Sequence, residues 1–158
     1  PDMLVALVSD HGFERVETVV NLAEAMRRDG AAGKFDVSHG LARALDSAAA
    51  RWFEEARAKG SLGIGRRVPE EEVKDFAPEL AGAEAAYEAA EGFLFGRGES
   101  GELYSKPHEV GVHGLWPGRP DYRSAFILWG KGIQPGRLPA MRITSIAGRL
   151  AELLGVRL

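Results

Sequence analysis

The sequence predicts an α/β fold in which helices flank a parallel sheet, and two apolar runs support this prediction most strongly. The first, Met-Leu-Val-Ala-Leu-Val, spans residues 3–8, and the second, Ser-Ala-Phe-Ile-Leu-Trp, spans residues 124–129. Both are continuously apolar rather than alternating, which is typical of strands buried on both faces of a parallel sheet. Elsewhere, apolar residues recur at helical spacing. We therefore expect both runs to belong to one parallel sheet.

The composition is that of a globular protein and excludes several functional classes. Lys and Arg total 20 against 23 Asp and Glu, and the net charge of −3 argues against a general nucleic-acid binder. Hydrophobic residues make up 45% and charged residues 27%, which argues against disorder. The absence of cysteine excludes disulfides and thiolate metal sites. We expect no membrane span and no signal peptide within this chain, and the localisation stays open.

The first part of the chain predicts a strand followed by helices. Three valines at 16–20 predict a short second strand, and Asn21 is a good N-cap for a helix over 22–28 that ends at Asp29-Gly30. We expect a loop or turn over 30–40. The spacing of apolar residues predicts a long helix over 41–59, which Gly60 ends.

The second part predicts two further helices and a long loop before the second core strand. Residues 61–67 are expected to form a loop with a brief strand, and a helix begins near Pro69. The Ala- and Glu-rich stretch 79–91 predicts a helix that ends at Gly92. Residues 93–118 predict one long loop of the kind that often carries function. The last helix is expected over 143–154, with Gly155 as its end.

Asp10 and His11 are the first candidates for a functional site, because they come directly after the first core strand. In α/β sheets, ligands bind beyond the carboxyl ends of the strands. A carboxylate and an imidazole side by side form a usual pair for zinc, and Gly12 permits a sharp turn. The alternative, a turn-capping Asp10 and a solvated His11, is equally compatible with the spacing.

The other histidines differ in their setting along the chain. His113 lies in the glycine-rich loop just before the second core strand and is the second metal-ligand candidate, with a surface loop histidine as the alternative. His39 precedes a helix and is interpreted as structural or solvated. His108 is interpreted as a non-ligand. No other segment has the setting of a phosphate loop or a nucleophile elbow.

Two segments together resemble the alkaline phosphatase superfamily, most closely its type I phosphodiesterase/nucleotide pyrophosphatase branch. The resemblance covers 3–28 and 110–156, whereas 30–109 is expected to form an insertion or cap-like region within the single domain or fragment 1–158. The motifs are Leu7-Val8-Ser9-Asp10-His11-Gly12-Phe13, the Val19–Leu22 step, Val112-His113-Gly114, Arg119–Ile127, Gly130-Lys131-Gly132-Ile133 and the segment from Ser145 to Gly155.

The resemblance implies a two-metal hydrolase of phosphodiester or nucleotide pyrophosphate bonds, acting on a small phosphoester or nucleotide. It implies two divalent ions, zinc or similar, with Asp10 and His11 holding one and His113 the other. In the family, a Thr or Ser nucleophile and the remaining metal ligands precede the Asp-His-Gly motif, where this chain has nine residues. We therefore expect the C-terminal half of an alkaline-phosphatase-like fold, with the missing N-terminal half as its partner and no activity alone.

Two alternatives remain beside this interpretation. One is another superfamily member, such as a phosphomutase, phosphonate hydrolase or sulfatase. The other is a non-catalytic truncated pseudoenzyme or assembly module. A sheet that lacks its neighbouring strands exposes edges and apolar surface. We therefore expect a homo-oligomer, with Trp129 and neighbouring apolar residues as the contact.

Overall fold

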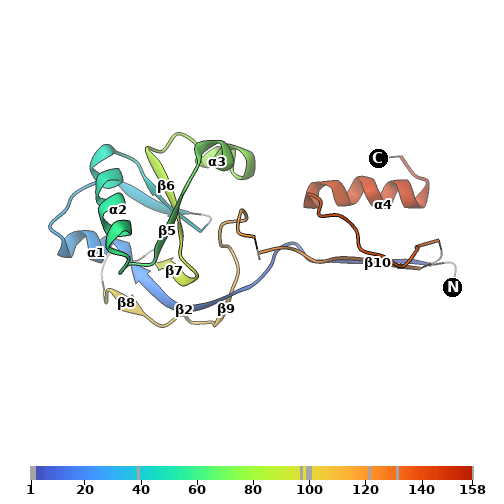
Figure 1. Cartoon of the computed structure of the whole chain (residues 1–158), viewed down its shortest axis with the longest axis horizontal. Helices are drawn as coiled ribbons and strands as arrows, with labels where there is room; N and C mark the ends of the chain where they lie inside the picture. Colours follow the sequence, from blue (N-terminus) through green and yellow to red (C-terminus); the bar gives the residue numbers. More distant parts are fainter. Residues whose placement is uncertain are drawn as a thin grey trace. The chain divides into compact units, whose positions relative to one another are not determined.

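The structure, a computed structural model, divides into two compact units (Figure 1). The central unit comprises Phe13–Tyr122, and the terminal unit combines Pro1–Gly12 with Arg123–Leu158. Both ends of the chain therefore belong to the same unit. The residues that the structure describes are 3–38, 40–96, 98, 101–120, 122–130 and 132–157.

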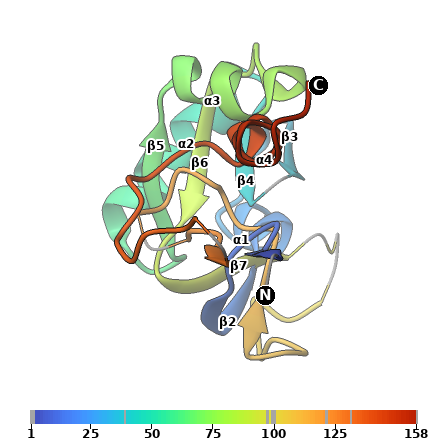
Figure 2. The ribbon, with the colours of Figure 1, turned by 90° about the vertical axis from the view of Figure 1, so that its right-hand side faces the viewer.

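The central unit contains a four-stranded antiparallel sheet in the spatial order β3-β4-β6-β5 (Figures 1 and 2). Helix α2 packs against this sheet, and the ring of Phe53 stacks on that of Tyr87 in β6 at a centroid distance of 5.2 Å. A short helix, α3, and a 3-10 turn, η1, connect β5 to β6. The elements span Phe35–Ser38 (β3), Leu41–Ala44 (β4), Ser47–Lys59 (α2), Ile64–Val68 (β5), Glu70–Phe76 (α3), Pro78–Leu80 (η1) and Ala85–Ala89 (β6).

A second sheet of the central unit is built around β2, Glu14–Asn21. The longest ladder joins β2 in parallel to β7, Gly92–Gly96. Two short strands, β8 (Tyr104–Ser105) and β9 (Gly111–Val112), pair with β2 antiparallel. Helix α1, Leu22–Arg28, follows β2 directly because the side chain of Asn21 accepts a hydrogen bond from the Glu24 N–H at 3.1 Å.

The terminal unit consists of a two-stranded ribbon and a C-terminal helix (Figure 1). Strand β1, Leu4–Val8, pairs antiparallel with β10, Phe126–Gly130. The 3-10 turn η2, Ile143–Ser145, leads into α4, Ile146–Leu154, which ends at Gly155 in the left-handed conformation, with φ 67°. Apolar side chains on one face of the ribbon are exposed, and Trp129 is 70% exposed. The expectation of a homo-oligomer through Trp129 stays a prediction.

The prediction of a parallel sheet is wrong for the two core strands. Both strands form close to the expected positions, but β1 and β10 run antiparallel to each other, and the other sheets are also mostly antiparallel. Leu7 is 61% exposed, so β1 is not buried on both faces either. The hydrophobicity of a segment indicates that it can form a strand with apolar faces, but it does not indicate how its neighbour runs. The direction of its neighbour is set by the path of the chain, which no local pattern contains.

Two helix predictions are wrong because tertiary pairing overrides local propensity. The expected helix over 41–59 begins only at Ser47, where the Asp46 side chain accepts a hydrogen bond from the Ala49 N–H at 2.8 Å, and its first residues form β4. The Ala-rich stretch 79–91 contains β6, a central strand that is buried along its whole length. Alanine favours helices and is depleted in strands, so the pairing of β6 with β4 and β5 overrides the local propensity here.

Other expectations are confirmed or corrected at individual elements. The strand at β2, the Asn21 cap and helix α1, the end of α2 at Gly60 and the end of α4 at Gly155 are confirmed. The loops expected over 30–40 and 93–118 contain the strands β3, β7, β8 and β9. In the part of the chain that the structure describes, no helix is long and apolar enough to cross a membrane.

The buried carboxylate of Glu24 predicts a specific acid sensitivity. Hydrogen bonds from Arg27, and then from Arg28, lower its pKa from 4.5 to about 2. A lowered pKa in the folded state stabilises the fold above the unfolded-state pKa, and this stabilisation is lost as the pH falls from about 4.5 to about 2. We expect Glu24→Gln to lower the midpoint of urea unfolding at pH 7. The difference in urea midpoint between the variant and the wild type should shrink as the pH falls through that window. A difference that stays constant would contradict this account.

Candidate metal centre

Asp10 and His11 lie in the turn that follows β1, and their side chains approach each other. The His11 Nε2 atom is 3.5 Å from Asp10 Oδ1. The other ring nitrogen of His11, Nδ1, lies 3.0 Å from the carbonyl oxygen of Gly12. The Asp10 side chain is 84% exposed, whereas that of His11 is 33% exposed. The carboxylate oxygen and the imidazole Nε2 therefore form a pair of potential ligand atoms that is open on the Asp10 side.

This geometry fits two ligands of one zinc ion. Ligand atoms at about 2.0–2.1 Å from a tetrahedral metal lie roughly 3.4 Å from each other. The separation of 3.5 Å between Asp10 Oδ1 and His11 Nε2 is close to that value. A Nδ1–H that donates to the Gly12 carbonyl leaves the lone pair of Nε2 available to a metal, which is the usual outer arrangement of a ligating histidine.

Hydrogen bonds between the ends of β1 and β10 hold this turn. The Ser9 N–H donates to the Ala125 carbonyl at 3.0 Å, and the Ala125 N–H donates to the Ser9 hydroxyl at 2.7 Å. The Ser124 hydroxyl donates to the Asp10 carbonyl at 3.1 Å. The backbone of Asp10 is therefore tied to the strand that lies beside it, although Asp10 itself is outside the ladder.

His113 lies in the central unit, directly after the short strand β9. Its ring contacts that of Phe13 edge-on, with a centroid distance of 5.8 Å. Gly114 follows in the left-handed conformation at φ 79°, and its N–H donates to the Tyr122 hydroxyl at 2.8 Å. The backbone directly after His113 is therefore held by a hydrogen bond to the side chain of Tyr122.

The residues that follow His113 are buried, within a stretch for which the sequence predicts only a long loop. Leu115 and Trp116 are 3% and 0% exposed, and Trp116 joins the apolar cluster of α3 and the antiparallel sheet. The Trp116 indole N–H donates to Glu72 Oε1 at 2.6 Å. Gly40 packs so closely against this segment that a Cβ at position 40 would lie 2.5 Å from the backbone nitrogen of Trp116. The loop after His113 is thus fixed by packing.

An ion-pair network continues from Trp116 into the sheet. Arg66 binds Glu72 with two hydrogen bonds, at 2.9 and 2.7 Å, and Glu88 with one, at 2.7 Å. The hydrogen bond from Arg66 is the main cause that lowers the pKa of Glu72, and the Trp116 indole adds to it. Arg119 joins the network from the His113 loop and contacts Glu14 and Glu88.

The structure places the predicted ligands in two units. Asp10 and His11 belong to the terminal unit and His113 to the central unit. Among the described residues, no three His, Cys, Asp or Glu side chains are grouped so that they could hold a metal ion. His108 is exposed between β8 and β9. His39 lies outside the described residues, as do Asp121 and Lys131 of the resemblance motifs.

No local sequence pattern predicts the acidic residues that fix the His113 loop. Glu14, Glu72 and Glu88 are isolated acids on three different elements, and only folding brings them to the arginines. Trp116 was the one visible sign, because a large aromatic residue in a loop rich in Gly and Pro needs an apolar place to pack.

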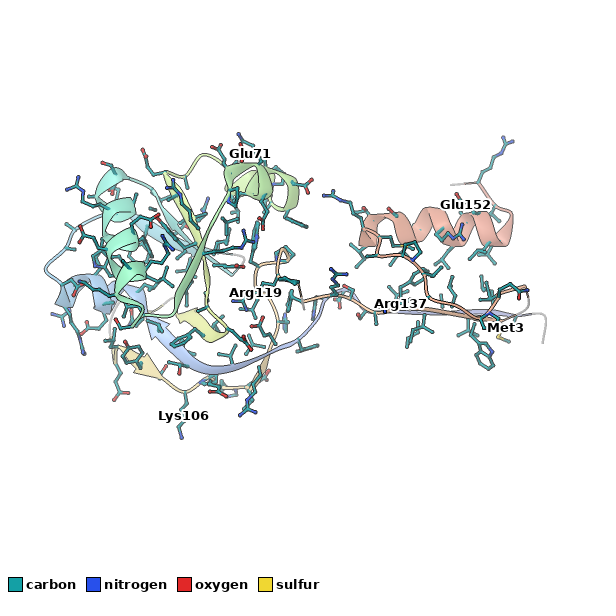
Figure 3. The ribbon with its side chains drawn as sticks, in the orientation of Figure 1. Met3, Glu71, Lys106, Arg119, Arg137 and Glu152 are labelled. Atoms are coloured by element: carbon teal, nitrogen blue, oxygen red, sulfur yellow. The ribbon has the colours of Figure 1, made fainter. Side chains whose placement is uncertain are left out.

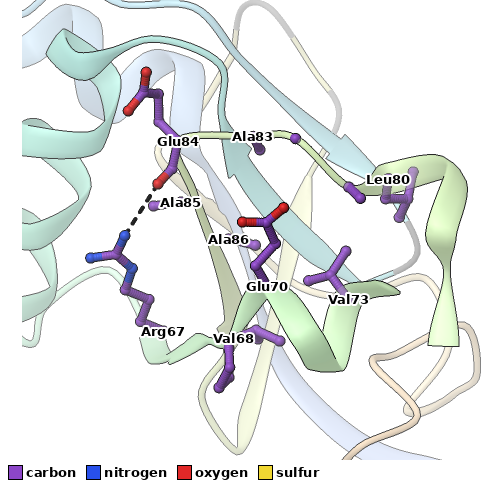
Figure 4. A pocket seen from close by; sticks show the side chains of 12 residues that line it. Arg67, Val68, Glu70, Val73, Leu80, Ala83, Glu84, Ala85 and Ala86 are labelled. Atoms are coloured by element: carbon purple, nitrogen blue, oxygen red, sulfur yellow. Dashed lines mark hydrogen bonds between the residues drawn. The ribbon is translucent and has the colours of Figure 1, made fainter. Parts of the chain in front are cut away.

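A cavity of about 310 Å³ lies elsewhere in the central unit, beside β5, α3 and the start of β6 (Figure 4). At its rim, the Arg67 guanidinium donates to the Glu84 carbonyl at 3.1 Å. Apolar side chains such as Val73 and Leu80 form much of its lining. The lining contains none of Asp10, His11 and His113, so the cavity is separate from the candidate ligands.

No family model matches the chain, and no curated protein sequence matches it. Among solved structures, it is similar to human ectonucleotide pyrophosphatase/phosphodiesterase 5, with a TM-score of 0.56 and 17% identical residues. The match covers 98% of this chain and 41% of that chain, so this chain spans about two fifths of the matched structure. At this level of identity, the similarity establishes a shared fold.

We expect Gly40→Ala to loosen the loop that follows His113. Gly40 has φ 74°, which an alanine adopts only with strain, and the added methyl would overlap the backbone of Leu115 and Trp116. The substitution should lower the free energy of unfolding by about 1–3 kcal/mol. Chemical denaturation checks this, with Gly30→Ala as a control: Gly30 has φ 65° but nothing within 4 Å of the added Cβ. Equal losses would show that backbone strain alone accounts for the effect.

Proposed function

We propose that this chain is part of a metal-dependent hydrolase of phosphodiester or nucleotide pyrophosphate bonds. In this proposal, Asp10 and His11 hold one divalent ion, zinc or a similar metal, and His113 holds the second. The substrate is a small phosphoester or nucleotide. The observation that carries the proposal is the pairing of Asp10 Oδ1 with His11 Nε2 at 3.5 Å, with the second ring nitrogen directed to a backbone carbonyl.

The fold similarity to human ectonucleotide pyrophosphatase/phosphodiesterase 5 supports the proposal. The match covers 98% of this chain and therefore includes the segments that carry both motifs.

The residues of this chain would act by binding and orienting. When bound, two divalent ions neutralise charge on the phosphoryl group and activate the nucleophile. The exposed Asp10 carboxylate supplies negative charge to one ion, and the Gly12 carbonyl keeps the proton on Nδ1 of His11. The proposal assigns the Thr or Ser nucleophile and the remaining ligands to the part of the catalytic domain that lies outside these 158 residues.

We expect the isolated chain to bind zinc weakly and through histidine. A structural zinc ion is usually bound by about four ligands. In our proposal, Asp10 and His11 supply two ligands to one ion, and His113 supplies one ligand to the other. In a zinc chloride titration followed by histidine NMR signals, His11 and His113 should shift. His11→Ala should weaken binding at the Asp10 site at least about tenfold and leave the response of His113 in place.

His108→Ala is the matched control, since His108 is an exposed loop histidine outside the proposed site. It should leave both responses unchanged. Tight stoichiometric zinc binding that survives both His11→Ala and His113→Ala would contradict the assignment of these ligands.

We expect the isolated chain not to hydrolyse a chromogenic phosphodiester at an enzymatic rate. A nucleophile and half of the metal ligands supply most of the transition-state stabilisation, and the proposal places them outside this chain. The measurement is product release from the purified chain with and without added zinc. Robust turnover that His11→Ala abolishes would mean that these residues suffice for catalysis.

A further inference from the structure

Glu14 is attached to the chain on both sides of His113. Its backbone pairs with Val112, the residue just before His113, in the β2–β9 ladder. Its carboxylate accepts a hydrogen bond from the guanidinium of Arg119, which comes six residues after His113. Glu14 also directly follows Phe13, whose ring contacts the His113 imidazole. A shift of Glu14 would therefore move both the strand before His113 and the ring beside it.

Arg119 connects this segment to the antiparallel sheet (Figure 3). Besides Glu14, it donates to the Ala89 carbonyl in β6, and its Nε lies 3.6 Å from Glu88 Oε2. The Arg119 side chain is only 11% exposed, and those of Glu14 and Glu88 are 22% and 12% exposed. Glu88 Oε2 has no hydrogen-bond partner, so its compensation depends on this nearby charge. A planar guanidinium donates to two acceptors in fixed directions and places its charge beside a third group, whereas the three donors of a lysine ammonium radiate from a single nitrogen.

We propose that Arg119 is a positioning residue for His113. By binding Glu14 on one side and β6 on the other, it fixes β9 and Phe13 against the antiparallel sheet, and it thereby sets the position of the imidazole. The inference rests on the proposed function for its consequence, since a positioned His113 matters as a metal ligand. The positioning itself concerns only contacts within the central unit.

The test compares Arg119→Met and Arg119→Lys with the wild type by NMR. The wild type should show a nuclear Overhauser effect between the ring protons of Phe13 and His113, and a ring-current shift of the His113 protons. Arg119→Met should abolish both while the signals of His11 and His108 stay in place. Arg119→Lys should restore part of the shift, because an ammonium can bind Glu14 or the Ala89 carbonyl but not every acceptor. Zinc chloride titration should show affinity at His113 reduced at least tenfold in Arg119→Met.

Arg43→Met is the matched control for general destabilisation. Arg43 lies in β4 of the same sheet, its side chain is 14% exposed, and it binds Asp36 and the Leu80 carbonyl. It should leave the His113 signals unchanged. If Arg119→Met does not fold, Glu14→Gln removes the same charge pair with less change of shape, and the same loss of the Phe13 signal is expected.

The outcomes separate the two proposals. A folded Arg119→Met that keeps the Phe13–His113 effect would overturn the positioning role, and so would an equal change in Arg43→Met. If zinc leaves His113 unaffected in the wild type, the metal assignment of His113 fails, while the ring signals still decide the role of Arg119.

Discussion

The ion pairs that link Glu14, Arg119, Glu88, Arg66 and Glu72 connect β2, the loop after His113 and α3 to the antiparallel sheet. The network begins at Glu14 on β2 and passes through residues of β6 and β5. It ends at Glu72 on α3, which accepts a hydrogen bond from the indole of Trp116. Removing one member of a buried ion pair typically costs 3–5 kcal/mol, because its partner is left without compensation. The loop that carries His113 depends on this network at two points, Trp116 and Arg119.

The burial of Arg119 and Glu88 makes their part of the network selective as well as stabilising, whereas the Arg66 side chain is 42% exposed. Arg119 is nearly enclosed, and the groups that it contacts lie on two elements: Glu14 on β2, and Glu88 and the Ala89 carbonyl on β6. An exposed ion pair of the same geometry would contribute little and would tolerate rearrangement. In the positioning role that we propose for Arg119, a change in one of these contacts would alter the position of the loop. The fixed guanidinium geometry is therefore suited to holding the proposed ligand His113 on an otherwise irregular segment.

Asp10 and His11 are fixed by simpler means. A two-stranded ribbon ends beside them, and serine hydroxyls join its strand ends to the turn. The short distance from His11 to Gly12 along the chain lets the imidazole use a local carbonyl. The two ligand atoms of this half of the proposed metal centre are adjacent in the sequence, whereas the ribbon that holds their turn joins segments more than a hundred residues apart.

The sequence by itself determined the features that depend on neighbouring residues. The Asn21 cap and the glycine ends of α2 and α4 follow from interactions within a few residues, and the apolar runs at β1, β2 and β10 locate those three strands. The tertiary structure alone decided the direction of β10 beside β1, the strand at 85–89, and the burial of Trp116 and Arg119. Alanine-rich and apolar segments are compatible with more than one structure. The contacts that select among these structures come from residues that are distant in the chain, and only the folded chain brings them together.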